Sequence, residues 1–354
     1  MNITIHPSKS PYTREQVLCY LTKIKYSPLP VNVDNITETV PPSLENLNKI
    51  IRLHLIAFPF DILGLHFRND HLVPVSSQGV YDVLVGQSHG WGSYCFGHNT
   101  LLKGMLQGLS YLVYSGCGRS NMHRPTLTLT PLTHMMLFVS ISPPETPANP
   151  QIYLVDVGFG GAFGGSGLVQ AVPFFDGSVV NGSAWPEKHR LIRAHHPKSS
   201  VSFPDATGKN PGGDWAVELC IEDDGTVENP RWVRLYHFWT NEFFEEDCEL
   251  ASFAICRMPG LNPFIDKVIC IKCFEVNEEG SNGGRKEKKL GRFVLAGNKV
   301  EKRIGRQHET VATFETDGAR MEALKRFCGV EINAEALEAF KDSPASLDRN
   351  KQQV

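Results

Sequence analysis

Apolar residues recur every three or four positions in the first part of the chain, which is the spacing of helices packed on one face. Thr13 and Gln16 have the spacing of a capping box, so a short helix is expected to begin there. Ser43 is placed to cap a second helix, and Pro59 ends its pattern. Residues 61–84 show only short apolar pieces and are predicted to be irregular.

A third helical pattern begins at Cys95, directly after a run of small residues. Its apolar face consists of Leu101, Leu102, Met105, Leu106 and Leu109. Backbone N–H groups at a helix start have no partner within the helix and favour negative charge. We therefore expect the Cys95 thiol to lose its proton more easily than a free cysteine, and the same N–H groups to be able to stabilise an oxyanion. The alternative is a buried structural cysteine beside a turn.

From residue 110 the apolar period becomes that of strands. The predicted strands of the middle part are 111–115, 133–142, 151–157, 168–172 and 189–194. Further strands are predicted at 215–222, 232–238, 267–274, 290–295 and 309–314, followed by a helix over 317–328. The fold class is therefore α+β. We expect a helical domain over 1–110, a β domain over 111–215, a mixed domain over 216–335 and a polar tail over 336–354 that is frayed after Ala339.

Two glycine-rich stretches are predicted to be connections. Residues 158–167 follow a strand but lack the lysine of a phosphate-binding loop and do not fit the dinucleotide fingerprint. Residues 278–289, rich in Gly, Ser and Lys, are expected to form a mobile hairpin tip.

Composition and charge narrow the function classes. The chain is 41% hydrophobic and 21% charged, with a net charge of −3, which gives no general attraction to nucleic acid or anionic membranes. We expect no membrane span and no signal peptide. Nine cysteines, an odd number, favour a reducing compartment and a cytoplasmic location. Cys270 and Cys273 have metal-ligand spacing, but on a strand they face opposite ways, so no metal site is expected.

Two further residues stand out beside Cys95. His134 opens a strand that is apolar on both faces, and Asp156 is the one charge in the apolar strand 152–157. A buried charge is costly unless it is paired. If the two strands are neighbours, Asp156 lies beside His134, and Cys95, His134 and Asp156 form a nucleophile, base and orienting carboxylate. A core histidine with satisfied hydrogen bonds and an aspartate that caps a turn are the alternatives.

Four segments resemble the motifs of the arylamine N-acetyltransferase family, over residues 43–332. The first is the segment Pro59-Phe60-Asp61-Ile62-Leu63, which follows a predicted helix that carries His54. The second is the cysteine motif Trp91-Gly92-Ser93-Tyr94-Cys95-Phe96-Gly97-His98-Asn99. The histidine motif Thr133-His134-Met135-Met136-Leu137 and the aspartate motif Val155-Asp156-Val157-Gly158-Phe159-Gly160 follow.

The same motifs also depart from the family pattern. Trp91 replaces an arginine, Ser93 replaces a glycine, and Asp61-Ile62 replace Glu-Asn. The resemblance implies that, in the family, this glutamate and this arginine form an ion pair that holds the cysteine loop. Trp91 cannot form that pair, so a stacked Trp91 is expected to brace the loop here.

The resemblance implies a helical domain, a small β-barrel and an α/β lid around a core like that of papain or transglutaminase. It implies that Cys95 takes an acyl group from an acyl-coenzyme A and passes it to an aromatic amine, with His134 moving protons and Asp156 holding the ring. Phe159, Phe60 and Thr133 would then contact substrate, although Phe159 is equally consistent with ordinary core. The residues that could meet the phosphates of coenzyme A are Lys286, Lys288, Lys289, Arg292, Lys299, Lys302, Arg303 and Arg306.

Several alternatives remain open at this stage. The acyl group could be acetyl, propionyl or malonyl, and neither the amine nor the oligomeric state follows from the sequence. The family resemblance also implies a role in xenobiotic metabolism. A cysteine hydrolase would use the same triad but release the acyl group to water. A non-catalytic relative that binds a ligand in the same cleft is the third hypothesis, because Trp91, Ser93 and Asp61-Ile62 break the family motifs.

Overall fold

The computed structural model of the chain describes residues 3–30, 32–87, 89–122, 127–142, 149–160, 167–201, 203–204, 211–221, 228, 230–276 and 289–349. The helices in these residues are α1 (Arg14–Lys23), α2 (Ile36–Thr39), α3 (Leu44–Ala57), α4 (Leu63–Phe67), α5 (Ser77–Tyr81), the π-helical turn η1 (Asp82–Gly86), α6 (Cys95–Gly108), α7 (Glu245–Arg257), α8 (Asp317–Ala323), the π-helical turn η3 (Leu324–Cys328) and α9 (Ala334–Phe340). The strands are β1 (Phe60–Asp61), β2 (Leu112–Ser120), β3 (His134–Ile141), β4 (Gln151–Val155), β5 (Val172–Pro173), β6 (Ser178–Asn181), β7 (Lys188–Arg193), β8 (Phe203–Pro204), β9 (Pro211–Gly212), β10 (Trp215–Cys220), β11 (Val233–Phe238), β12 (Ile269–Glu275), β13 (Leu290–Ala296), β14 (Lys299–Ile304) and β15 (Gln307–Thr313).

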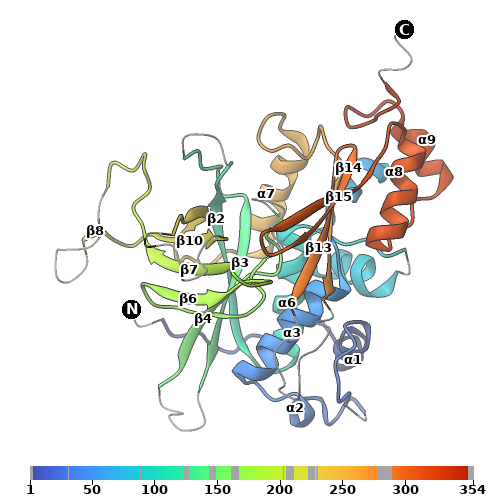
Figure 1. Cartoon of the computed structure of the whole chain (residues 1–354). Coiled ribbons are helices and arrows are strands. Elements are labelled where there is room, and N and C mark those ends of the chain that lie inside the picture. Colours follow the sequence, from blue (N-terminus) through green and yellow to red (C-terminus); the bar gives the residue numbers. More distant parts are fainter. Residues whose placement is uncertain are drawn as a thin grey trace.

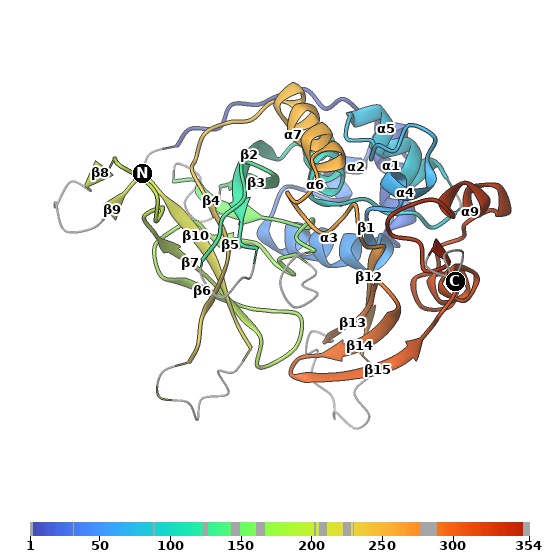
Figure 2. The ribbon, with the colours of Figure 1, turned by 90° about the horizontal axis from the view of Figure 1, so that it is seen from above.

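Two antiparallel sheets and a group of helices make up the α+β fold. The larger sheet has eight strands in the order β5-β4-β3-β2-β11-β10-β7-β6, and its two edge strands are joined by residues 174–177, so it curls toward a barrel. The smaller sheet has the order β1-β12-β13-β14-β15. In Figure 2 the barrel-like sheet lies at the left and strands β13, β14 and β15 lie at the lower right, whereas α1, α2 and α4–α7 lie toward the top and α9 lies at the right.

Strand β3 is fully buried because the core lies on both of its faces. Met135, Leu137 and Val139 point into the core shared with the helices, whereas Met136 and Phe138 point into the core of the barrel-like sheet. Helix α6 packs on the outer face of β2 and β3 (Figure 1). This double burial confirms the prediction of a strand that is apolar on both faces.

The predicted helix starts are confirmed. Thr13 caps α1 in a complete capping box with Gln16, and the Ser43 hydroxyl accepts the Asn46 N–H at the start of α3. The irregular structure predicted for residues 61–84 is wrong, because α4, α5 and η1 lie there. These turns are too short for the helical period to show.

Helix α7 was not predicted, for a physical reason. Its buried positions are Cys248, Ser252, Ile255 and Cys256, whereas Leu250 is 73% exposed. Ile255 is thus the one large apolar side chain that the helix buries, beside cysteines and a serine, while Leu250 is exposed, so its sequence lacks the usual apolar stripe.

The domain boundary predicted at residue 215 falls inside the larger sheet, because β10 and β11 beyond it pair with β7 and β2. The N-terminal part is also joined to the C-terminal sheet, since β1 pairs with β12. The predicted segments therefore interlock through shared sheets. The predicted connections at 161–166 and 278–288 lie outside the described residues. No helix among the described residues is long and apolar enough to cross a membrane.

The fraying predicted after Ala339 is wrong for residues 340–349, which pack on the rest of the chain. Phe340 is 1% exposed, and its ring packs on Phe67 with the ring centres 4.7 Å apart. The Asp317 carboxylate accepts hydrogen bonds from the Ser346 hydroxyl at 2.6 Å and from the Leu347 N–H at 3.2 Å. The buried ring of Phe340 and the buried carboxylate of Asp317 thus hold the polar C-terminal segment against the rest of the protein.

This packing predicts that Phe340→Ala lowers the free energy of unfolding by about 3–5 kcal/mol, as for other buried aromatic side chains. The matched control is Leu250→Ala, which removes a side chain that is 73% exposed and is expected to change the same free energy by less than about 0.5 kcal/mol. Urea unfolding of the three proteins measures both values. Equal stability of Phe340→Ala and the parent would show that the tail does not dock.

Candidate functional site

Cys95 is the first residue of α6, as the sequence predicts, and it is 6% exposed. Its Sγ lies 3.7 Å from the carbonyl oxygen of Thr133, to which the thiol donates. The backbone N–H groups of Met135 and Phe96 face the sulfur. Gly158 is needed at this point, because a Cβ there would lie 2.4 Å from the Cys95 Cα. The glycine of the aspartate motif thus lets its loop pass directly over the cysteine.

The expected direction of the Cys95 pKa shift is wrong for the resting protein. Burial raises the pKa of the Cys95 thiol well above its usual value, and the N–H groups of Met135 and Phe96 offset only part of that rise. The free energy lost when a thiolate is removed from water exceeds the stabilisation that the N–H groups at the start of the helix provide. Burial thus favours the protonated thiol, and a base is expected to take its proton during the reaction.

His134 and Asp156 lie together, as predicted. Strands β3 and β4 are antiparallel neighbours, and continuing their register places the two residues on one face as diagonal neighbours. The His134 Nε2–H donates to Asp156 Oδ2 at 2.8 Å, and both side chains are buried. Burial alone would raise the pKa of Asp156, but His134 and the other donors keep it below its usual value. Asp156 therefore stays ionised.

Asn99 completes this arrangement and was not singled out from the sequence. Its Nδ2 donates to Asp156 Oδ1 at 3.1 Å and to the Met135 carbonyl oxygen at 2.8 Å. Its Oδ1 accepts the Val157 N–H at 3.2 Å. Asn99 thereby connects α6, which carries Cys95, to strand β3 and to the residues that follow β4. The available signal was its position one helical turn after Cys95, on the same face of α6.

Asp61 braces the loop before Cys95 in a way that the sequence did not predict. Its Oδ2 accepts the Gly92 N–H at 2.5 Å and its Oδ1 accepts the Leu63 N–H at 3.1 Å, while its own N–H donates to the Ser93 carbonyl oxygen at 2.7 Å. Burial raises the pKa of Asp61 to about 7, against the effect of those N–H groups. The short carboxylate thus holds the loop backbone directly.

Trp91 does not lie under the loop. Its Nε1–H donates to the Glu331 carbonyl oxygen at 2.9 Å, and its ring meets Phe67 edge-on with the ring centres 6.5 Å apart. It joins the loop to the C-terminal segment, so the expectation of a tryptophan stacked under the cysteine loop is corrected.

A chain of buried histidines lies beneath the same loop. The carbonyl oxygen of Pro59 can only accept, so the His98 Nε2 at 3.0 Å carries the hydrogen. His98 Nδ1 then accepts from the His54 Nε2–H at 2.9 Å, and His54 Nδ1 accepts from the Tyr20 hydroxyl at 3.0 Å. Both imidazole rings must be neutral for this series of hydrogen bonds to form. Burial lowers the pKa of both histidines, that of His98 to about 4, and so favours their neutral forms. The chain fixes the Pro59 segment against α6.

One mostly apolar cavity of about 240 Å³ contains Cys95 and His134. The three residues predicted to contact substrate, Phe60, Thr133 and Phe159, line it as well. The Thr133 hydroxyl turns to Thr130 at 2.8 Å, so Thr133 meets the thiol through its carbonyl group. The other lining residues are Tyr94, Ser120, Asn121, Met122, Thr130, Gly158, Gly160, Ile255, Leu261, Asn262, Pro263, Phe264 and Ile269.

Three of the eight basic residues predicted to meet phosphates are paired with carboxylates. Arg292 is paired with Glu187 at 3.0 Å, and Arg303 and Lys299 are both paired with Glu301. Lys286 and Lys288 lie outside the described residues.

A family model described as N-acetyltransferase matches residues 43–279. The N-malonyltransferase FDB2 of Fusarium pseudograminearum is 25% identical over 340 residues, 92% of this chain and 91% of that protein. The arylamine N-acetyltransferase of Mycobacterium tuberculosis is 35% identical over 222 residues, 62% of this chain and 64% of that protein.

Solved structures share the fold. The arylamine N-acetyltransferase from Mycobacterium abscessus has a TM-score of 0.68 at 19% identity and covers 97% of this chain and 98% of its own. The Mycobacterium marinum enzyme in complex with CoA has a TM-score of 0.65 at 21% identity and covers 92% of this chain and 98% of its own.

The Asp61 brace predicts a particular pH dependence. Asp61 is ionised above about pH 4 in the unfolded chain but keeps its proton to about 7 in the folded one, so folding takes up a proton in between. The unfolding free energy of the parent is therefore expected to fall, relative to Asp61→Asn, as the pH rises from about 4 to about 7 and to stay level above. Urea unfolding of both proteins at several pH values measures the difference. A difference that does not vary with pH would mean that Asp61 is ionised throughout.

Proposed function

Because the chain belongs to the arylamine N-acetyltransferase family and is thus an acyltransferase of that family, we propose that it moves a short acyl group from an acyl-coenzyme A to an aromatic amine through an acyl-Cys95 intermediate. One observation carries the proposal: Cys95 shares an apolar cavity with His134, whose ring is held by the buried Asp156.

The first half of the reaction acylates the cysteine. The ionised Asp156 only accepts, so His134 carries its hydrogen on Nε2, and Nδ1 is left as the base. As the sulfur of Cys95 attacks the thioester carbonyl carbon, the thiol proton passes to His134. The tetrahedral oxyanion forms beside the N–H groups at the start of α6. Coenzyme A leaves when its sulfur takes the proton from His134, and the acyl group remains on Cys95.

The second half transfers the acyl group to nitrogen. The amine attacks the acyl-cysteine, His134 takes a proton from the attacking nitrogen, and the sulfur of Cys95 is released and reprotonated. The aromatic rings of Phe60, Phe159 and Phe264 line the cavity, which suits a flat aromatic acceptor and limits the entry of water. This lining favours transfer to an amine over the alternative of hydrolysis.

The acyl group is proposed to be acetyl or a similarly short group. One relative is named an N-malonyltransferase and others are named arylamine N-acetyltransferases, so malonyl-coenzyme A is the principal competing donor. All nine cysteines are free thiols, which supports a reducing, cytoplasmic location.

Intact-protein mass spectrometry is expected to show one added acyl group after mixing with acetyl-coenzyme A, and no addition in Cys95→Ser, because a serine hydroxyl gives up its proton to a histidine far less readily than a thiol and is a weaker nucleophile. Cys117→Ser is the matched control, since Cys117 is also a buried thiol but does not line the Cys95 cavity. It should acylate like the parent. The same experiment with propionyl- and malonyl-coenzyme A identifies the preferred donor, and an unmodified parent with all three donors would refute the proposed intermediate.

Asp156→Asn should slow acyl transfer by a factor on the order of 10⁴, because the amide loses the charge and can favour the wrong histidine tautomer. Stopped-flow release of coenzyme A measures the rate. Asp214→Asn is the control. Asp214 also pairs with a buried histidine, His237, but it does not line the cavity that contains Cys95 and His134. Equal rates for Asp156→Asn and the parent would show that Asp156 does not orient the base.

A further inference from the structure

Ser120, the last residue of β2, brings a side-chain hydroxyl group to the wall of the Cys95 cavity. Its backbone is fixed, because its N–H donates to the Thr130 hydroxyl at 2.9 Å and its carbonyl oxygen accepts the Thr130 N–H at 2.9 Å. The residue is partly exposed, and no hydrogen bond joins its hydroxyl group to any part of the chain that the structure describes. A hydroxyl group is thus held in the cavity wall where an occupant can reach it.

The register of the barrel-like sheet places this hydroxyl group on the side of His134. Gly118 of β2 pairs with His134 of β3, and Ser120 lies two residues further on, so its side chain points to the same face of the sheet. Ser120 also pairs with Tyr236 of β11, whose ring packs on the His134 ring with the ring centres 4.6 Å apart. Ser120 and His134 are therefore diagonal neighbours, about 7–8 Å apart. One aromatic ring with a substituent spans such a distance.

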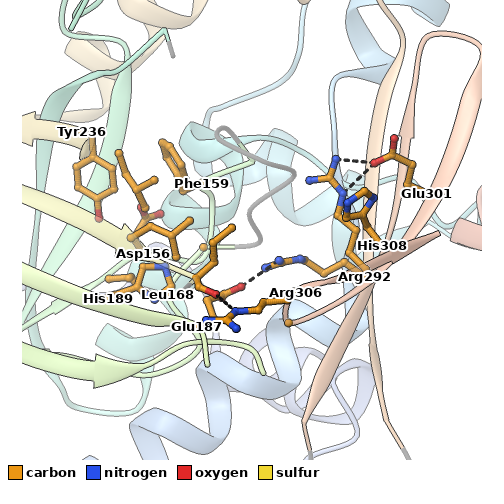
Figure 3. A pocket seen from close by; sticks show the side chains of 16 residues that line it. Asp156, Phe159, Leu168, Glu187, His189, Tyr236, Arg292, Glu301, Arg306 and His308 are labelled. Atoms are coloured by element: carbon orange, nitrogen blue, oxygen red, sulfur yellow. Dashed lines mark hydrogen bonds and ion pairs between the residues drawn. The ribbon is translucent and has the colours of Figure 1, made fainter. Parts of the chain in front are cut away.

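Phe159 forms part of the wall between two cavities. With Asp156 and Tyr236 it lines a second cavity, of about 300 Å³, between the barrel-like sheet and the five-stranded sheet (Figure 3). Ser120 does not line that cavity but, with Phe159, lines the one that contains Cys95. A molecule that meets the Ser120 hydroxyl group therefore lies in the cavity of the nucleophile.

The other polar side chains of this cavity, apart from Cys95 and His134, already have partners within the protein. In the part of the wall that the structure describes, they are those of Tyr94, Asn121, Thr130, Thr133 and Asn262. Asn262, for example, donates to the Ile255 carbonyl oxygen at 3.2 Å and accepts the Phe264 N–H at 2.8 Å. The Ser120 hydroxyl group differs from them, because binding an occupant there breaks no hydrogen bond of the protein.

The reaction decides which part of the acceptor meets Ser120. The attacking nitrogen lies beside His134, which takes its proton, and the ring extends from there along the cavity that Phe60 and Phe159 line. A group on the opposite side of the ring from the nitrogen is then the part that reaches Ser120. That group must be uncharged, because a charge is costly in a mostly apolar cavity. A serine hydroxyl both donates and accepts, so a phenolic hydroxyl group fits.

We propose that Ser120 is a specificity-determining residue for the acceptor amine, and that its hydroxyl group binds a hydroxyl substituent para to the amine. The inference rests on the proposed acyl transfer and names a class of acceptor for it, the aminophenols whose hydroxyl group lies opposite the nitrogen. An aniline without such a substituent leaves the Ser120 hydroxyl group without a partner when the ring excludes water from it, so it binds less tightly.

The test compares 4-aminophenol with 4-methylaniline, which carries a methyl group in place of the hydroxyl group. The full chain is first acylated on Cys95 with an acyl-coenzyme A, and intact-protein mass spectrometry then follows the loss of the acyl group after each amine is added. The ratio of the two rates, 4-aminophenol over 4-methylaniline, is expected to fall about three- to tenfold in Ser120→Ala, since one neutral hydrogen bond is lost. Comparing the ratios cancels the intrinsic difference in reactivity between the two amines.

Two controls separate this role from a structural one. Ser120→Ala removes a hydroxyl group that has no partner in the described part of the chain, so its melting temperature should equal that of the parent. Asn262→Ala changes another part of the same cavity wall and should leave the ratio of the two rates unchanged. An equal ratio in Ser120→Ala and the parent, or the same fall in Asn262→Ala, would overturn the proposal.

Failure of the acyl transfer itself would show separately, as a parent protein that no acyl-coenzyme A modifies. Titration calorimetry of the unmodified parent and of Ser120→Ala with the same two amines then tests Ser120 without the chemistry. The preference for 4-aminophenol over 4-methylaniline, as a ratio of affinities, is expected to be about three- to tenfold greater in the parent than in Ser120→Ala. An equal preference in both proteins would contradict the role of Ser120.

Discussion

The structure around the site depends on keeping one charged carboxylate, Asp156, inside an apolar core. A lone buried charge would cost several kcal/mol. Asp156 is tolerated because His134, Asn99 and the Gly158 N–H all donate to it. These donors come from β3, from α6 and from the loop after β4. The charge therefore fixes the relative positions of the elements that carry the nucleophile and the base, because displacing any of them would leave it unsatisfied.

A second set of contacts positions Cys95 from the other side. The Asp61 segment holds the loop backbone, and the neutral chain from Tyr20 through His54 and His98 holds Pro59. Burial keeps both histidines neutral near neutral pH and raises the pKa of Asp61 to about 7. The consequence is a low-dielectric surrounding in which the resting thiol keeps its proton. Reactivity then comes from proton transfer to His134 during attack, with no need for a thiolate formed in advance.

Much of this could be predicted from the sequence. Cys95 at a helix start and the pairing of His134 with Asp156 followed from a helical period after small residues and from a charge in an apolar strand. The direction of the Cys95 pKa shift did not, because burial depends on residues far along the chain, such as those of β12 and α7. Asp61 holding the backbone of Gly92 was equally hidden, since a family comparison suggested only a missing ion pair. Contacts between distant segments leave no periodic pattern.

The tautomer of His134 tests the central claim most directly. If Asp156 is ionised and orients the ring, the hydrogen sits on Nε2 and Nδ1 is bare. Nitrogen-15 NMR of the histidine-labelled protein near neutral pH, with His134 assigned by its loss in His134→Gln, distinguishes the two nitrogens. The account predicts a protonated Nε2 with a slowly exchanging, low-field proton. A hydrogen on Nδ1 would contradict it, because the nitrogen assigned as the base would then be unable to accept the thiol proton.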